Sequence, residues 1–177
     1  QSGLDEAGQG LFMYLFVDVY GVTDGINQIH EPTMTLVDHE FHASKGFILS
    51  PFINHSRLAR FIEAGPSGAA LPTHNLIGLM VKTRDDSAGM VNPDASVSKP
   101  VTDDDLGRLN RGAAIAKEIL VKAGADPKSL VASVHNVRGR AKALGEAGQE
   151  REAVQLLESA ITNSPQSFEL HQLAAGF

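Results

Sequence analysis

Several residues that could do chemistry lie in the segment Asp38-His39-Glu40-Phe41-His42, which holds two histidines and two carboxylates. A zinc-binding helix places its histidines four positions apart. Here they are three apart, and the alternation of residue types predicts a strand. Side chains at odd spacing in a strand point to opposite faces. We therefore expect a solvated sheet face with one packed histidine rather than a metal site.

Three further candidates are His55, Arg57 and Arg60, in and after the polar loop Asn54-His55-Ser56-Arg57. A histidine in such a loop can act as a general base or simply cap the loop. The arginines can contact an anion. A fourth candidate, His135, stands in Ser133-Val134-His135-Asn136-Val137-Arg138-Gly139. Residues 1–177 contain no G-x-G-x-x-G, P-loop or G-x-S-x-G motif.

The elements that would hold these residues are mostly strands. Residues 36–42 alternate and residues 47–53 form a continuous apolar run, which predicts two strands joined by a turn at 43–46. A third run, 57–63, carries most of the positive charge nearby. Further strands are predicted within 11–22, 26–34, 76–83 and 90–101. No helix is predicted between residues 11 and 101.

After Val101 the pattern changes to a helix. Thr102 followed by three aspartates is an N-cap signal with negative charge in the first turn, and Gly124 is a stop signal. One apolar stripe is made by Leu106, Leu109, Ala113, Ala116, Leu120 and Ala123. A short helical turn is expected at Asp126-Pro127. The fold class predicted is α+β, with an antiparallel sheet of about six strands flanked by helices.

Composition excludes several classes of protein. The net charge is −6 and no long basic run occurs, so we expect no nucleic-acid partner. With no cysteine, disulfides, thiolate metal sites and a cysteine nucleophile are excluded, and a cytoplasmic location is expected. The strongest apolar run, Leu11 to Val19, contains Asp18 and is too short to span a bilayer.

The last 40 residues differ in composition, which predicts a domain boundary near 135–140, with domains 1–137 and 138–177. Residues 138–177 are alanine-rich and predict a helical hairpin as a C-terminal extension. Gly148, Ala153, Ala160 and Pro165 stand at spacings that resemble one tetratricopeptide unit. Such a unit could pack on the sheet domain, be the stub of an array, or be a chance match.

The order of motifs in residues 2–134 resembles the substrate-binding part of glucose–methanol–choline (GMC) flavin-dependent oxidoreductases. The resemblance is carried by Ser2-Gly3-Leu4, Phe16-Val17-Asp18-Val19-Tyr20-Gly21-Val22, Glu40-Phe41-His42, Gly46-Phe47-Ile48-Leu49-Ser50-Pro51 and the charged helix after Val101. It implies an antiparallel sheet that closes over the flavin ring of FAD. It also implies oxidation of a small alcohol to a carbonyl compound, with a histidine as base.

The chain departs from that family in two places. The dinucleotide-binding motif would precede Gln1, and the His-Pro-Gly-Gly-Thr-like segment is replaced by the sequence around His135. The resemblance thus implies His135 and His55 near the reacting carbon, Arg57 and Arg60 at the flavin, and no activity without a separate FAD-binding part. The alternative is a non-enzymatic interaction module that binds another protein through residues 138–177. A truncated or composite product is a third possibility.

Overall fold

The computed structural model describes residues 8–12, 14–86 and 89–133, together with the single positions 151, 154, 155 and 158. Its elements are, in chain order, β1 (Gln9–Leu11), β2 (Phe16–Val22), the 3₁₀ turn η1 (Gln28–His30), α1 (His42–Lys45), β3 (Phe47–Pro51), α2 (Arg57–Ala70), β4 (Leu76–Thr83), β5 (Gly89–Val91), β6 (Val97–Ser98), α3 (Asp103–Lys122), the 3₁₀ turn η2 (Pro127–Ser129) and β7 (Val131–Ala132).

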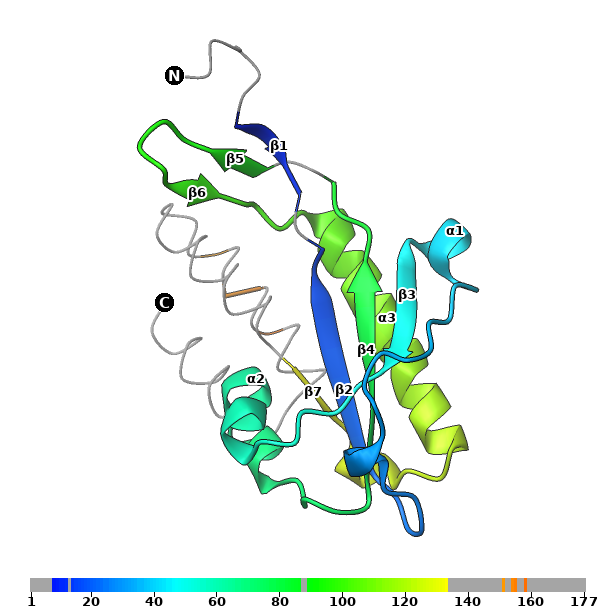
Figure 1. Ribbon diagram of the computed structural model, residues 1–177. Coiled ribbons are helices and arrows are strands. Elements are labelled where there is room, and N and C mark those ends of the chain that lie inside the picture. The colour runs from blue at the N-terminus through cyan, green and yellow to red at the C-terminus, as the bar shows by residue number, and fades with distance from the viewer. Residues whose placement is uncertain are drawn as a thin grey trace.

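The strands form two antiparallel sheets, so the predicted α+β class is confirmed. The main sheet has the order β3-β4-β2-β7, and β1, β5 and β6 form a smaller sheet beyond its end (Figure 1). The described strands thus number seven in two sheets, where one sheet of about six was expected. The predicted helical hairpin at 138–177 lies outside the described residues, apart from the four single positions. None of the described helices is long and apolar enough to cross a lipid bilayer.

Helix α3 lies across one face of the main sheet (Figure 1). Strand β2 pairs with β4 so that Val17 stands opposite Val81 and Val19 opposite Leu79, which turns these apolar side chains to the same face. They meet the predicted stripe of α3, of which Leu106, Leu109, Ala116 and Leu120 are buried. Ala123 is exposed, because it is the C-cap of the helix rather than part of its packed face.

Two features of α3 fix its position. The predicted N-cap is present, since the Thr102 side chain accepts from the Asp105 N–H and the Asp105 carboxylate accepts from the Thr102 N–H. At Gly112 the helix backbone lies against β4, because a Cβ there would come within 2.3 Å of Val81 Cγ1. A larger residue at this position would push the helix away from the sheet.

Helix α2 packs near the other face of the sheet, at the end where β2 finishes (Figure 1). A second apolar cluster forms there from Tyr20, Ile53, Leu71 and Leu76. The helix consists of two pieces, because Ala64 and Gly65 have non-helical backbone angles and Pro66 begins the second piece. The prediction that no helix lies between residues 11 and 101 is therefore wrong for Arg57–Ala70.

Two predicted strands are also wrong. Residues 36–42 make one isolated bridge, Asp38 to Leu49, and then enter α1, because the Asp38 carboxylate accepts from the Glu40 N–H at 2.8 Å and turns the chain. Residues 26–34 contain η1 instead of a strand. The strands predicted within 11–22, 47–53 and 76–83 and the turn at Asp126-Pro127 are confirmed.

Candidate functional site

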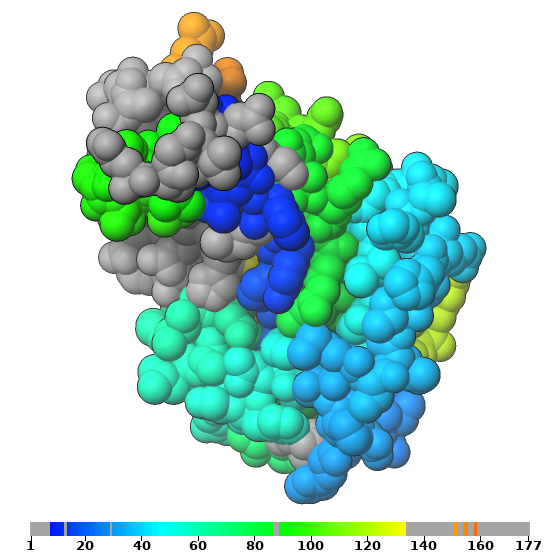
Figure 2. All heavy atoms as spheres, turned by 45° about the horizontal axis from the view of Figure 1, so that its top comes forward, coloured from blue at the N-terminus to red at the C-terminus, as the bar shows by residue number. Residues whose placement is uncertain are grey.

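The face of the main sheet opposite α3 carries polar groups. Alternation along the paired strands places Phe16, Asp18 and Tyr20 of β2 on this face, beside Met80 and Lys82 of β4. In Figure 2 the dark-blue chain that leads into β2 runs beside the green of β4, with α2 in teal next to them. A sheet with one apolar face and one face of mixed polarity can present the second face to a ligand.

Asp18 is the most unusual residue of this face. It is fully buried, and neither carboxylate oxygen has a hydrogen-bond partner within the described part of the chain. The pKa of Asp18 is raised to about 8, mainly by burial and in smaller part by the nearby Glu63, while Lys82 opposes the shift. The carboxyl group is consequently mostly protonated at neutral pH and able to donate a hydrogen bond.

The backbone of Asp18 is held by the end of the described chain. The Ser133 N–H donates to the Asp18 carbonyl at 2.8 Å, and the Asp18 N–H donates to Ser133 Oγ at 3.0 Å. Strand β7 pairs with β2 immediately beside these bonds, at Val19 and Tyr20. Ser133, the last residue of the described range 89–133, therefore lies next to the backbone of Asp18.

Tyr20 and Glu63 form a hydrogen-bonded pair near Asp18. The Tyr20 hydroxyl donates to Glu63 Oε2 at 2.6 Å, and the Asn54 side chain donates to Glu63 Oε1 at 2.8 Å. Burial raises the pKa of Tyr20 well above its ordinary value, and so does the charge that Asp18 acquires at alkaline pH, so the phenol keeps its proton. We refer to Asp18, Tyr20, Asn54 and Glu63 as the Asp18 cluster.

The chemistry open to this cluster is that of two carboxyl groups in different environments. The Asp18 carboxyl is unpartnered and carries a proton, whereas both oxygens of Glu63 accept hydrogen bonds. Such a division between neighbouring carboxyl groups separates a proton donor from an acceptor. Neither residue is among the site residues predicted above. The one sequence signal that could have pointed to this site is Asp18 itself, a lone aspartate within a strongly β-prone apolar run.

Arg60, predicted to contact a flavin, is completely buried in the structure. Its guanidinium donates to four backbone carbonyls: those of Asn54 at 2.7 Å, His55 at 3.1 Å, Gly68 at 3.2 Å and Leu71 at 3.2 Å. These bonds join both pieces of α2 to the loop before it. We assign Arg60 a structural role on this geometry, and its role at a flavin stays a prediction.

The other predicted residues lie apart from the cluster or outside the described chain. His55 is exposed in the loop before α2, and Arg57 is exposed at the first position of that helix. No hydrogen bond or ion pair between described residues joins either side chain to the Asp18 cluster. His135 lies outside the described residues. The roles of all three remain predictions.

The two histidines near α1 need a correction. The argument that they point to opposite faces of a strand is wrong, because no strand forms there and their rings meet edge to face with centroids 6.2 Å apart. Over the described ranges, no group of three or more His, Asp or Glu side chains is arranged to hold a metal ion.

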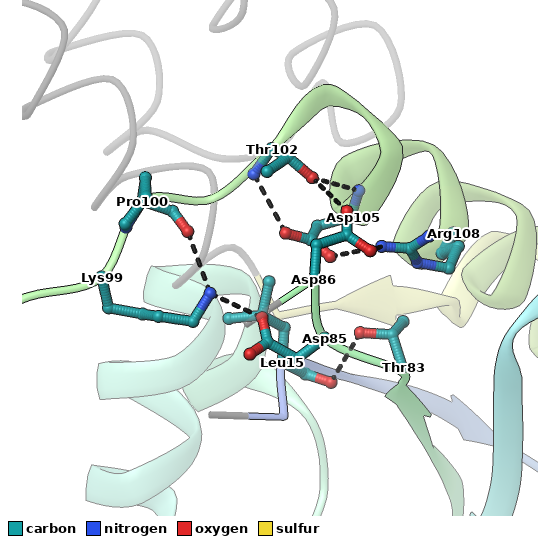
Figure 3. Close-up of polar contacts among 9 residues, drawn as sticks. All are labelled: Leu15, Thr83, Asp85, Asp86, Lys99, Pro100, Thr102, Asp105 and Arg108. Carbon is teal, nitrogen blue, oxygen red and sulfur yellow. Dashed lines mark hydrogen bonds and ion pairs between the residues drawn. The ribbon is translucent and has the colours of Figure 1, made fainter. Parts of the chain in front are cut away.

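A second polar network joins the end of β4 to the first turn of α3 (Figure 3). Arg108 pairs through one terminal nitrogen with Asp105 at 2.6 Å and Asp86 at 2.8 Å. The Thr102 hydroxyl donates to the same Asp86 at 2.9 Å. The hydrogen bond from Arg108, followed by that from Thr102, holds the pKa of Asp86 below its ordinary value. This network fixes the orientation of Arg108.

The loop that follows β6 is attached to the same region. Lys99 forms an ion pair with Asp85 and donates to the carbonyl of Pro100 at 3.1 Å (Figure 3). The Thr83 hydroxyl donates to the Leu15 carbonyl at 3.2 Å. These bonds tie the segments after β6 and before β2 to the end of β4 and the residues that follow it.

Comparison with known proteins adds no family assignment. No family model matches the chain, and no curated protein or solved structure matches it significantly. The function is therefore interpreted from the chemistry of the sites described above.

Proposed function

We propose that this chain supplies the substrate side of a flavin-dependent alcohol oxidoreductase of the GMC type, and that the FAD-binding part is a separate segment or chain. The observation that carries the proposal is the double hydrogen bond between Asp18 and Ser133. These bonds hold Ser133, two positions before the proposed base His135 in sequence, beside the backbone of Asp18. The resemblance implies that a sheet of this kind closes over the flavin ring.

The proposed reaction converts a small alcohol to a carbonyl compound. The alcohol carbon gives a hydride to the oxidised flavin, and the alcohol oxygen gives its proton to a base. We assign the base to His135, two positions after Ser133 in sequence, with His55 as the second candidate. A protonated Asp18 on this face adds no negative charge beside a flavin that becomes more negative as it accepts the hydride, and the phenol of Tyr20 orients Glu63.

The test is a titration of the ¹⁵N-labelled full chain with FMN, followed by amide chemical shifts. The proposal predicts weak saturable binding, with shifts concentrated in β2, β4 and residues 131–133. Absence of shifts at millimolar FMN, or shifts confined to other elements, would contradict it. The absorbance spectrum after addition of FAD and gel filtration provides a second test. We expect a colourless protein, since a retained flavin spectrum would mean that the chain binds FAD by itself.

A protein-interaction module is the second candidate. It is favoured by the exposed surface of α2, where Leu58, Phe61 and Ile62 are 69%, 43% and 55% exposed at helical spacing. In this alternative the sheet is a scaffold, and residues 138–177, proposed to form a helical hairpin, bind another protein in the cytoplasm. Deletion of 138–177 should then abolish capture of the partner, and no flavin should bind under any condition.

A further inference from the structure

A basic hollow lies on the α3 side of the chain, away from the Asp18 cluster. Its volume is about 560 Å³, and it lies between the end of α1, the residue that follows β4, and the first half of α3. The lining residues are Ala43, Ser44, Lys45, Gly46, Arg84, Asp104, Arg108 and Arg111. Four of these eight side chains are cationic and one is anionic, in a chain whose net charge is −6.

Backbone geometry keeps the hollow open at Gly46. This glycine has φ of 75°, and a Cβ there would lie 2.7 Å from Arg108 Cδ, so only glycine lets the chain pass the arginine. The Gly46 carbonyl accepts from the Arg84 N–H at 2.8 Å, which holds Arg84 at the rim. Two of the cationic residues are thus positioned by one glycine.

The charges of the hollow are unevenly compensated. Arg108 is paired with Asp105 and Asp86, so it serves as a fixed wall. Lys45, Arg84 and Arg111 make no ion pair within the described residues, and Lys45 lies over the Phe41 ring at 4.7 Å. Three exposed cations that converge on one hollow repel one another, and a bound anion would relieve that repulsion.

We propose that this hollow binds a small molecule through a phosphate group that carries two or more negative charges. Guanidinium groups match the geometry of phosphate oxygens and donate two parallel hydrogen bonds to them. The volume lies within the range of about 300–1,000 Å³ typical of small-molecule sites, so it holds a phosphate and the group attached to it. This proposal is independent of the flavin proposal and of the Asp18 cluster.

The test is isothermal titration of the full chain with sodium pyrophosphate at low ionic strength. We expect one saturable site, whose dissociation constant rises about threefold to tenfold in Arg84→Gln and in Arg111→Gln. Asp104→Asn removes the one acidic side chain of the lining and should lower the dissociation constant. Lys122→Gln, at the exposed end of the same helix, is the matched control and should leave it unchanged.

Three outcomes would overturn the proposal. The first is no saturable heat at millimolar pyrophosphate. The second is equal affinity of the wild type, Arg84→Gln and Arg111→Gln, provided that circular dichroism shows unchanged melting of all variants. The third is tighter binding of citrate than of pyrophosphate, which would contradict the assignment to phosphate.

Discussion

Replacing Asp18 by asparagine removes an ionisable group from the interior while keeping its size. In the folded protein the Asp18 pKa is about 8, compared with 3.8 for the free side chain. Because the folded pKa is the higher one, the stabilising effect of Asp18 is complete below pH 4 and is lost as the pH rises toward 8. The wild type should therefore lose stability relative to Asp18→Asn across this range.

The magnitude follows from the width of the pH window. Each pH unit between the two pKa values changes the free energy of unfolding by about 1.4 kcal/mol for one proton. Between pH 5 and pH 7 the wild type should thus lose about 2–3 kcal/mol relative to Asp18→Asn. The absolute cost of the asparagine is the same at both pH values and cancels from the comparison.

The assay is urea unfolding followed by far-ultraviolet circular dichroism at pH 5, 6 and 7, with Asp24→Asn in an exposed turn as the control. The free energies of the wild type and Asp18→Asn should diverge with pH, whereas those of the wild type and Asp24→Asn should stay parallel. Parallel curves for Asp18→Asn would refute the reasoning about burial. A relative loss of stability of Asp18→Asn toward pH 7 would instead show that Asp18 is ionised and paired with Lys82.

Three further substitutions test the packing, each by thermal and urea unfolding. Gly112→Ala should lower the free energy of unfolding by about 1–3 kcal/mol, because the new Cβ would overlap Val81. Gly107→Ala on the same helix is the control and should be neutral or stabilising. Equal effects of the two substitutions would contradict the close approach of helix and strand. Thr102→Ala should cost about 1 kcal/mol through loss of the helix cap, and no loss would mean that the cap is not formed in solution. Arg60→Met should cost at least about 2 kcal/mol, since it leaves buried carbonyls without donors, and an unchanged unfolding midpoint would argue against the structural role of Arg60.

The sequence correctly predicted the elements that are determined by their own residues. Helix α3 has both a cap at Thr102 and an apolar stripe at helical spacing. Strand β4 is apolar from Leu76 to Val81 and is mostly buried on both faces. In each case the residues that decide the structure lie within the element itself.

The errors concern segments in which two local signals oppose each other. Helix α2 contains Gly65 and Pro66, which normally indicate a break, and its two pieces are joined by the side chain of Arg60. The N-cap Ser56 and the helical spacing of Leu58, Phe61 and Ile62 were local signals for this helix. The alternation in 36–42 predicts a strand, yet the Asp38 turn prevents pairing beyond a single bridge.

The Asp18 cluster shows a second limitation, which concerns partners that are far apart in sequence. A single aspartate in a β-prone run does not reveal whether it faces solvent or the protein interior. Its position depends on the pairing of β2 with β4, and its pKa depends in part on Glu63 of α2, elements that are far apart in sequence. The basic hollow likewise combines α1, the end of β4 and α3, so no contiguous motif marks it.

The pairing of β7 with β2 has a consequence for folding kinetics. The bonds between Asp18 and Ser133 span 115 positions, so the main sheet stays incomplete until nearly all of the described chain has been synthesised. Contacts of such long sequence separation slow folding, because a large loop must close before they stabilise anything. During that time the edge of β2 that will accept β7 is unpaired, and an unpaired strand edge favours association with other chains. Slow folding, rather than low stability of the folded protein, should therefore limit the yield of soluble protein. Expression at low temperature or with a chaperone should raise that yield.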